Sequence, residues 1–124
     1  MVPKSSVLLW KEIYEIAEKV CTHFGMSYGK ILPETRPRAR HYGEATACDK
    51  CFHNPNIDER NCNEKILRIR VHQLHKKNRP LAGSTIIRTL AHELAHLREW
   101  GHNPLHRALE KEIINFIRDL GYTV

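Results

Sequence analysis

The segment from 90 to 106, LAHELAHLREWGHNPLH, constrains the fold of this chain more than any other. His92 and His96 are four residues apart, so a helix would place both imidazoles on one face, about one turn from each other, with Glu93 beside them. Apolar residues at three- and four-residue steps, from just before this segment into it, predict that the helix also has a buried side. These are Ile86, Ile87, Leu90, Ala91 and Leu94. The pattern predicts two metal-binding nitrogens and a carboxylate at one surface.

A catalytic zinc site usually takes three protein ligands and leaves the fourth position to water. His102 is the first candidate for the third ligand. A continuous helix would carry it about 15 Å along the axis from His92, so the chain must turn back. We expect the helix to run from Ser84, as N-cap, to Trp100, and Gly101 to end it in the left-handed conformation. Alternative third ligands on the next helix are His106, Glu110 and Glu112.

The HELAHLREWGHNP segment resembles the active-site segment of zincin metallopeptidases. Its spacing has the length of the metzincin pattern HExxHxxGxxH, with Glu99 in place of the glycine. It is more similar to the SprT-like, WLM and YgjP-like group, in which the third His belongs to a segment HxPxF before another helix. Here His106 stands where that group has the aromatic residue. The motif covers about residues 80–110, and a looser strand-then-helix pattern extends to about residue 38.

The resemblance implies a zinc metallopeptidase in which one Zn²⁺ is bound by His92, His96 and His102. A metal-activated water would attack the peptide carbonyl with Glu93 as general base. SprT-like and WLM proteases act on proteins attached to DNA, so the resemblance implies a protein or peptide substrate and makes DNA a candidate partner. The runner-up interpretation is a catalytically silent or latent zinc-binding domain that binds nucleic acid or a protein, and a hydrolase of non-peptide substrates is a third.

The rest of the sequence predicts one α+β domain over residues 1–124, a minimal zincin-like fold. We expect three helices packed on a small, mostly antiparallel sheet of about three strands. The helices are predicted at 5–24, at 84–100 and from Pro104 to Gly121, and the first starts at Ser5 or Ser6 and ends at Gly25. Ile31 and Leu32 predict a short edge strand, and a second strand would end near Ala47. KILRIRVH, residues 65–72, is the clearest strand, with one apolar and one cationic face.

A cysteine-rich hairpin insertion is expected at about 48–62. A CxxC pair followed by a third cysteine, with a histidine nearby, is typical of a structural zinc site. The candidate ligands of this second metal are Cys48, Cys51, His53 and Cys62. A disulfide, a thiolate that blocks the catalytic metal and ordinary free thiols are alternatives.

The net charge of +6 is concentrated in the middle of the chain. Residues 31–80 hold eleven Lys and Arg against six Asp and Glu, including Arg36, Arg38 and Arg40 at alternate positions. Such a region can attract DNA phosphates, although scattered solubilising charge is the simpler interpretation. No apolar stretch reaches the roughly 18 residues of a membrane span, and no signal peptide is evident. We expect an intracellular, cytoplasmic monomer without a membrane partner.

Overall fold

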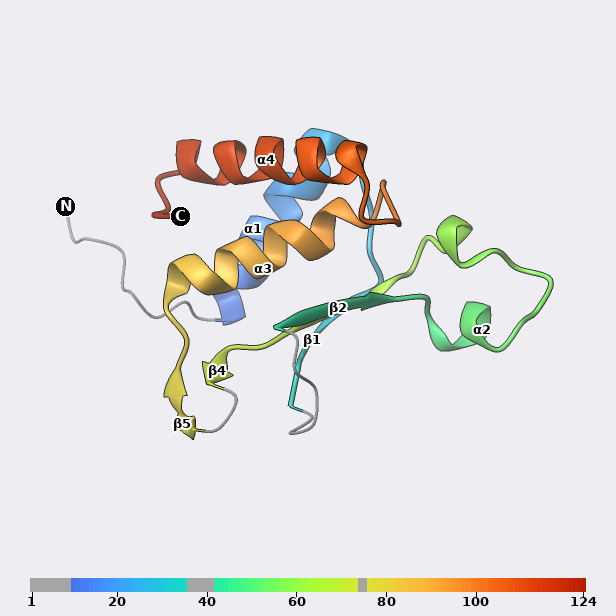
Figure 1. The fold of residues 1–124 in the computed structure, drawn as a ribbon, viewed down its shortest axis with the longest axis horizontal. Coiled ribbons are helices and arrows are strands. Elements are labelled where there is room, and N and C mark those ends of the chain that lie inside the picture. Colours follow the sequence, from blue (N-terminus) through green and yellow to red (C-terminus); the bar gives the residue numbers. More distant parts are fainter. Residues whose placement is uncertain (1–9, 36–41, 74–75) are drawn as a thin grey trace.

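Three long helices cover one face of a small sheet (Figure 1). The computed structural model describes residues 10–35, 42–73 and 76–124. Helix α3 contacts helices α1 and α4 and strands β2 and β3, so it lies at the centre of the fold. The long helices are α1 (Trp10–Phe24), α3 (Gly83–Ala95) and α4 (Pro104–Asp119), and the sheet consists of β1 (Lys30–Pro33), β2 (Gly43–Thr46) and β3 (Ile66–Ile69). The α+β class is confirmed.

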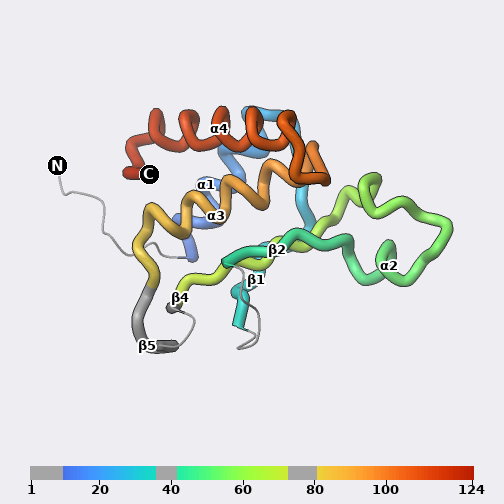
Figure 2. Tube along the Cα trace, viewed as in Figure 1, coloured from blue at the N-terminus to red at the C-terminus, as the bar shows by residue number. Residues whose placement is uncertain are grey.

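Smaller elements lie in the connections. Between β2 and β3 the chain forms a short helix, α2 (Asp49–Phe52), and one 3-10 turn, η1 (Glu59–Asn61). After β3 comes a separate antiparallel pair, β4 (His72–Gln73) and β5 (Lys76–Pro80), which leads into α3. The tube in Figure 2 shows how far the connection that holds α2 projects beyond the end of the sheet.

The sheet is mixed, and the expectation of a mostly antiparallel sheet was wrong. Its strand order is β1-β3-β2, with β1 parallel and β2 antiparallel to β3. In this three-stranded sheet, β2 and β3 follow one another in the chain and pair antiparallel after a chain reversal. Because β1 lies on the other side of β3, its direction is not set by a hairpin. The central strand is β3, and β2 is an edge strand.

The apolar positions predicted on the strands and helices form the core. Leu67 and Ile69 of β3 are fully buried, as is Leu90 of α3. The cationic face predicted along 65–72 is interrupted, because β3 ends at Ile69 and Arg70 is buried at 5% exposure. The core contains Ile13, Ile16, Val20, Ile31, Leu67, Ile69, Ile86, Ile87, Leu90, Leu94, Leu109, Ile113 and Ile117.

Helix α3 starts and ends differently from the prediction. Its N-cap is Ala82, which makes no side-chain cap, so Ser84 does not have that role. The helix ends at Ala95, where the amides of His96, Leu97 and Arg98 bond to carbonyls three residues back and the last turn tightens. Gly101 lacks a positive φ, so the turn toward His102 begins earlier and needs no left-handed glycine.

The end of α1 and both ends of α4 agree with the prediction. Gly25, with φ of 67°, follows α1, and Gly121, with φ of 101°, follows α4. Asn103 caps α4 by accepting a hydrogen bond from the amide of His106, and Pro104 occupies the first turn. Ser5, Ser6 and the three alternating arginines at 36, 38 and 40 lie outside the described residues. No helix in 10–35, 42–73 or 76–124 has the length and apolarity needed to cross a bilayer.

Candidate metal centre

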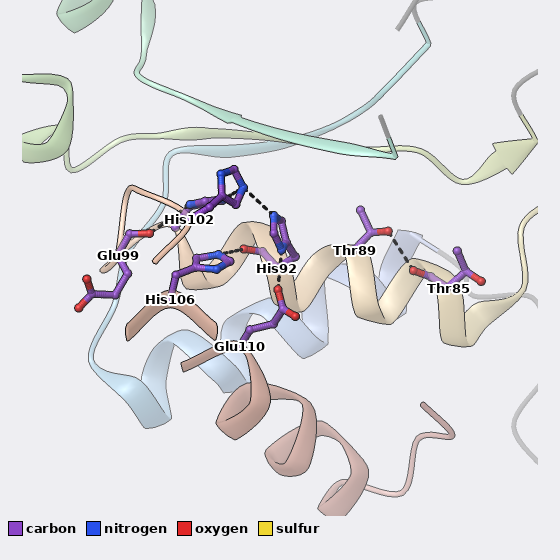
Figure 3. A network of polar contacts seen from close by, with 8 residues as sticks. Thr85, Thr89, His92, Glu99, His102, His106 and Glu110 are labelled. Atoms are coloured by element: carbon purple, nitrogen blue, oxygen red, sulfur yellow. Dashed lines mark hydrogen bonds and ion pairs between the residues drawn. The ribbon is translucent and has the colours of Figure 1, made fainter. Parts of the chain in front are cut away.

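The C-terminal turn of α3 and the loop after it bring three imidazoles together (Figure 3). The Nε2 atom of His102 lies 3.1 Å from Nε2 of His92 and 3.2 Å from Nε2 of His96. Zinc–nitrogen bonds of 2.0–2.1 Å in a tetrahedral arrangement place neighbouring nitrogens about 3.3 Å apart. Nε2 of His102 therefore lies, from each of the other two Nε2 atoms, at nearly the separation that two ligands of a single ion have.

The other ring nitrogen of each helix histidine has a partner that sets the ring's orientation. Nδ1 of His92 lies 2.5 Å from Oε1 of Glu110, which reaches it from α4. Nδ1 of His96 lies 3.1 Å from the backbone carbonyl of Glu99. Both partners accept hydrogen bonds, so each Nδ1 carries the proton and each Nε2 has its lone pair available. This tautomer is the one that binds a metal through Nε2.

His106 completes a cluster of four imidazoles. It is 1% exposed, and its ring stacks on that of His96 with centroids 4.1 Å apart. Ligand atoms of His92, His96 and His106 also fall within 4.8 Å of one another, so this trio could hold a metal ion as well. However, Nε2 of His106 lies 3.0 Å from the carbonyl oxygen of His92 and donates to it. That bond engages Nε2 of His106, and His102 and His106 are both candidates for the third ligand.

The two carboxylates weighed as alternative ligands occupy different places. Glu110 contacts Nδ1 of His92, on the side of the ring away from His102. Glu112 is exposed on α4. Glu110 was named from the sequence as an alternative third ligand, and its contact with Nδ1 of His92 fits a carboxylate that orients a ligand.

Glu93 is buried beside the histidines at 5% exposure. Burial, together with the charges of Glu44 and Glu110, raises the pKa of Glu93 to about 8. Burial, followed by the charge of His106, lowers the pKa of His96 to about 4 and keeps its ring neutral. A divalent cation between these groups would favour the ionised carboxylate and the neutral imidazole. The electrostatics therefore suit a cation at this place.

A cleft of about 470 Å³ opens at the cluster, between α3 and the edge strand β2. A second cavity, of about 390 Å³, shares Gly43, His92 and Glu93 with the first and adds Arg88 and Glu110. Glu93 thus lies where two hollows meet. The first cavity is lined by Gly43, Glu44, Ala45, His92, Glu93, His96, Trp100 and His102.

Close approach between β2 and α3 occurs at Gly43. A Cβ atom there would lie 2.6 Å from Cγ2 of Thr89 and 2.7 Å from Oε2 of Glu93. No other residue type fits without displacing one of them. The sequence interpretation missed the β2 residues of the cleft, although a glycine inside a strand is a known sign of a close backbone approach.

Three of the four residues predicted for a second metal site also come together. Ligand atoms of Cys48, Cys51 and Cys62 lie within 4.8 Å of one another. His53 is exposed, and its ring packs edge-on against Phe52. All three thiols are free of disulfides. The structure therefore groups the sulfurs, and the nitrogen ligand stays a prediction.

No protein-family model, curated protein or solved structure matches this chain. The possible metal-binding groups are consequently supported by their own geometry. We can only propose a relationship to the zincins, the identity of the ion and the reaction.

Proposed function

We propose that this chain is a zinc-dependent metallopeptidase with a minimal zincin-like fold and a SprT-like arrangement of ligands. The observation that carries the proposal is that Nε2 of His102 lies within 3.2 Å of Nε2 of both His92 and His96, while the Nδ1 atoms of both helix histidines are bonded to acceptors. Zinc suits three neutral imidazoles. His102 is accessible to solvent, so the ion would have an open side toward the cleft.

The chemistry follows from the groups around that open side. A zinc ion bound there would polarise a carbonyl and acidify water, which allows hydrolysis near neutral pH. Glu93 lines the same cleft and would accept a proton from the attacking water. It would then deliver that proton to the amine that leaves when the peptide bond breaks. Glu110 would hold His92 in place throughout, through its bond to Nδ1.

An extended polypeptide is the substrate that the cleft suits best. Within the described residues β2 pairs with β3 alone, and Gly43, Glu44 and Ala45 of β2 line the cleft beside the histidines. An extended peptide can add to a strand edge through main-chain hydrogen bonds. Such pairing would lay a substrate carbonyl along the cleft beside Glu93. The edge strand would be β2, since β3 is central in the sheet.

Glu93→Gln tests the catalytic assignment. The variant should retain stoichiometric zinc and lose hydrolysis of an unfolded, fluorescently quenched polypeptide by on the order of 10²–10⁴-fold. Glu112→Gln is the matched control, because Glu112 is a carboxylate exposed on α4, and it should keep full activity. Undiminished turnover in Glu93→Gln would refute the role of Glu93 as general base.

Two histidine variants separate the possible third ligands. His102→Ala should lose tight zinc binding, whereas His106→Gln should keep it, because the glutamine amide can still donate to the carbonyl of His92. The opposite result would assign the site to His92, His96 and His106. Circular dichroism of each protein shows whether the fold is intact.

DNA association is a second part of the proposal, and it is supported only by the excess of basic residues in 31–80. It predicts a salt-dependent gel shift with single- or double-stranded DNA. Binding of DNA by a zinc-loaded protein that hydrolyses neither unfolded nor DNA-bound proteins would favour the silent binding domain instead. Absence of any shift at low salt would exclude DNA as a partner.

A further inference from the structure

The connection between β2 and β3 has almost no apolar core of its own. It runs from residue 47 to residue 65 and contains only α2 and η1, neither of which has a buried residue. Its buried side chains are Ala47, Cys62 and Lys65. Long connections with so little regular structure are uncommon in small domains. A segment of this kind usually needs a cross-link or a metal to hold a single conformation.

Three thiols meet inside this connection. Cys48 is the N-cap residue of α2, Cys51 lies within α2, and Cys62 directly follows η1. The sulfurs of Cys48 and Cys62 are 3.6 Å apart, close to the separation of two thiolates on one zinc ion, whose zinc–sulfur bonds are about 2.3 Å. Both short helical turns therefore present cysteine at their ends, and the two turns meet through these side chains.

The surroundings also suit bound thiolates. The backbone amide of Cys48 donates to the sulfur of Cys62 over 3.4 Å, and such bonds stabilise negative charge on sulfur. The Lys65 side chain is buried at 3% exposure, and its ammonium group donates to the carbonyls of Cys62, at 2.6 Å, and Arg60, at 3.0 Å. Three thiolates and one divalent cation carry one net negative charge, which the ammonium group of Lys65 would balance.

Lys65 also links the connection to the cleft. Its ammonium nitrogen lies 5.4 Å from the centre of the Trp100 ring, and Trp100 lines the cavity beside His96. The connection begins directly after β2, whose residues form the opposite part of the cavity lining. The connection therefore contacts one side of the cleft through Trp100 and continues from β2 on the other side.

We propose that Cys48, Cys51 and Cys62 bind a second, thiolate-preferring divalent cation, of which Zn²⁺ is the expected one, and that this ion fastens the connection next to the cleft. The ion is structural. It is independent of the histidine cluster, and its presence does not depend on peptidase activity. His53, two residues after Cys51, is the nitrogen donor closest to it in sequence.

Metal titration of the full chain tests this proposal without an activity assay. Reduced, metal-depleted protein should bind two equivalents of Co²⁺ or Zn²⁺, and cobalt should produce a near-ultraviolet charge-transfer band that only thiolate ligands give. His92→Ala/His96→Ala should bind one equivalent and keep the band. Cys51→Ser and Cys62→Ser should each lose the band and one equivalent. Cys21→Ala is the matched control, since Cys21 lies in the core of α1, and it should behave as wild type.

Failure of this proposal is distinguishable from failure of the proposed function. One equivalent in the wild type without a charge-transfer band would overturn the cysteine site and leave the histidine site intact. If Cys21→Ala lost the charge-transfer band while Cys51→Ser and Cys62→Ser kept it, the cysteine site would also be overturned. Because Cys62 is buried and its serine variant can lose its fold, the partly exposed Cys51 gives the decisive variant.

Discussion

Glu110 gives the sharpest test of how the metal centre is organised. Its carboxylate lies 2.5 Å from Nδ1 of His92, and it reaches that nitrogen from a different helix. Glu110→Ala removes the acceptor that fixes the tautomer and orientation of His92. Nε2 of His92 would then be less basic and less well directed toward the position shared with His96 and His102.

The size of the effect depends on the kind of interaction that the substitution removes. Replacing the hydrogen-bond partner of a metal-binding histidine typically lowers metal affinity 10- to 100-fold. That factor corresponds to about 1.4–2.7 kcal/mol. Removal of a metal ligand itself would cost considerably more, so the magnitude distinguishes an orienting carboxylate from a coordinating one.

Competition with a chromophoric chelator measures the zinc affinity of the histidine site in the wild type and in Glu110→Ala. Glu112→Ala is the control, since it removes an exposed carboxylate from the same helix. We expect the control to match the wild type. An affinity of Glu110→Ala equal to that of the control would refute the orienting role, and a complete loss of binding would show that Glu110 is itself a ligand.

Three further predictions concern the cleft, the metal-free protein and the loop that holds His102. Gly43→Ala should reduce hydrolysis while zinc content stays the same, because the added carbon would meet Glu93 and Thr89; unchanged turnover with equal zinc, measured side by side, counts against the close approach. Metal-depleted Glu93→Gln should lose stability as the pH falls from about 6.5 to about 4; the variant is used because the raised pKa of Glu93 would change the stability of the wild type in the opposite direction over this range. The pKa of His96 is lowered to about 4 in the folded protein. Below about pH 6.5 the ring of His96 therefore binds a proton in the unfolded chain before it does so in the folded protein, and this lowers the free energy of unfolding. Each pKa unit corresponds to about 1.4 kcal/mol, so the expected loss in the free energy of unfolding, measured by urea denaturation, is on the order of 3 kcal/mol. A free energy of unfolding that does not change between pH 6.5 and pH 4 would contradict this prediction. Asn103→Ala should cost about 1 kcal/mol of stability and weaken zinc binding by loosening the neighbouring His102; a variant with wild-type stability and affinity would show that the cap of α4 does not position this ligand.

The sequence predicted the parts of the site that depend on helical periodicity. The placement of His92, Glu93 and His96 on one face follows from their spacing, and the apolar stripe of the same helix predicted which face is buried. The return of His102 was expected because the alternative, a continuous helix, would separate the ligands. The start of α4 was evident from Asn103 and Pro104, whose chemistry is local.

Features that depend on contacts between distant segments were not predictable in the same way. The parallel pairing of β1 with β3 and the edge position of β2 are properties of the whole sheet. The helix was expected to continue to Trp100 because Gly101 could end it in the left-handed conformation, yet the chain tightens at Ala95 and turns there. Arg70 was assigned to an exposed face by alternation, which fails because the strand ends one residue earlier.

Anomalous diffraction from a zinc-loaded crystal tests the central claim most directly. We predict a zinc peak about 2.0–2.1 Å from Nε2 of each of His92, His96 and His102, with Glu110 bonded to the far nitrogen of His92. A zinc-loaded protein whose map has no peak among these three nitrogens, or whose peak is coordinated by His106 or Glu110 in place of His102, would contradict it.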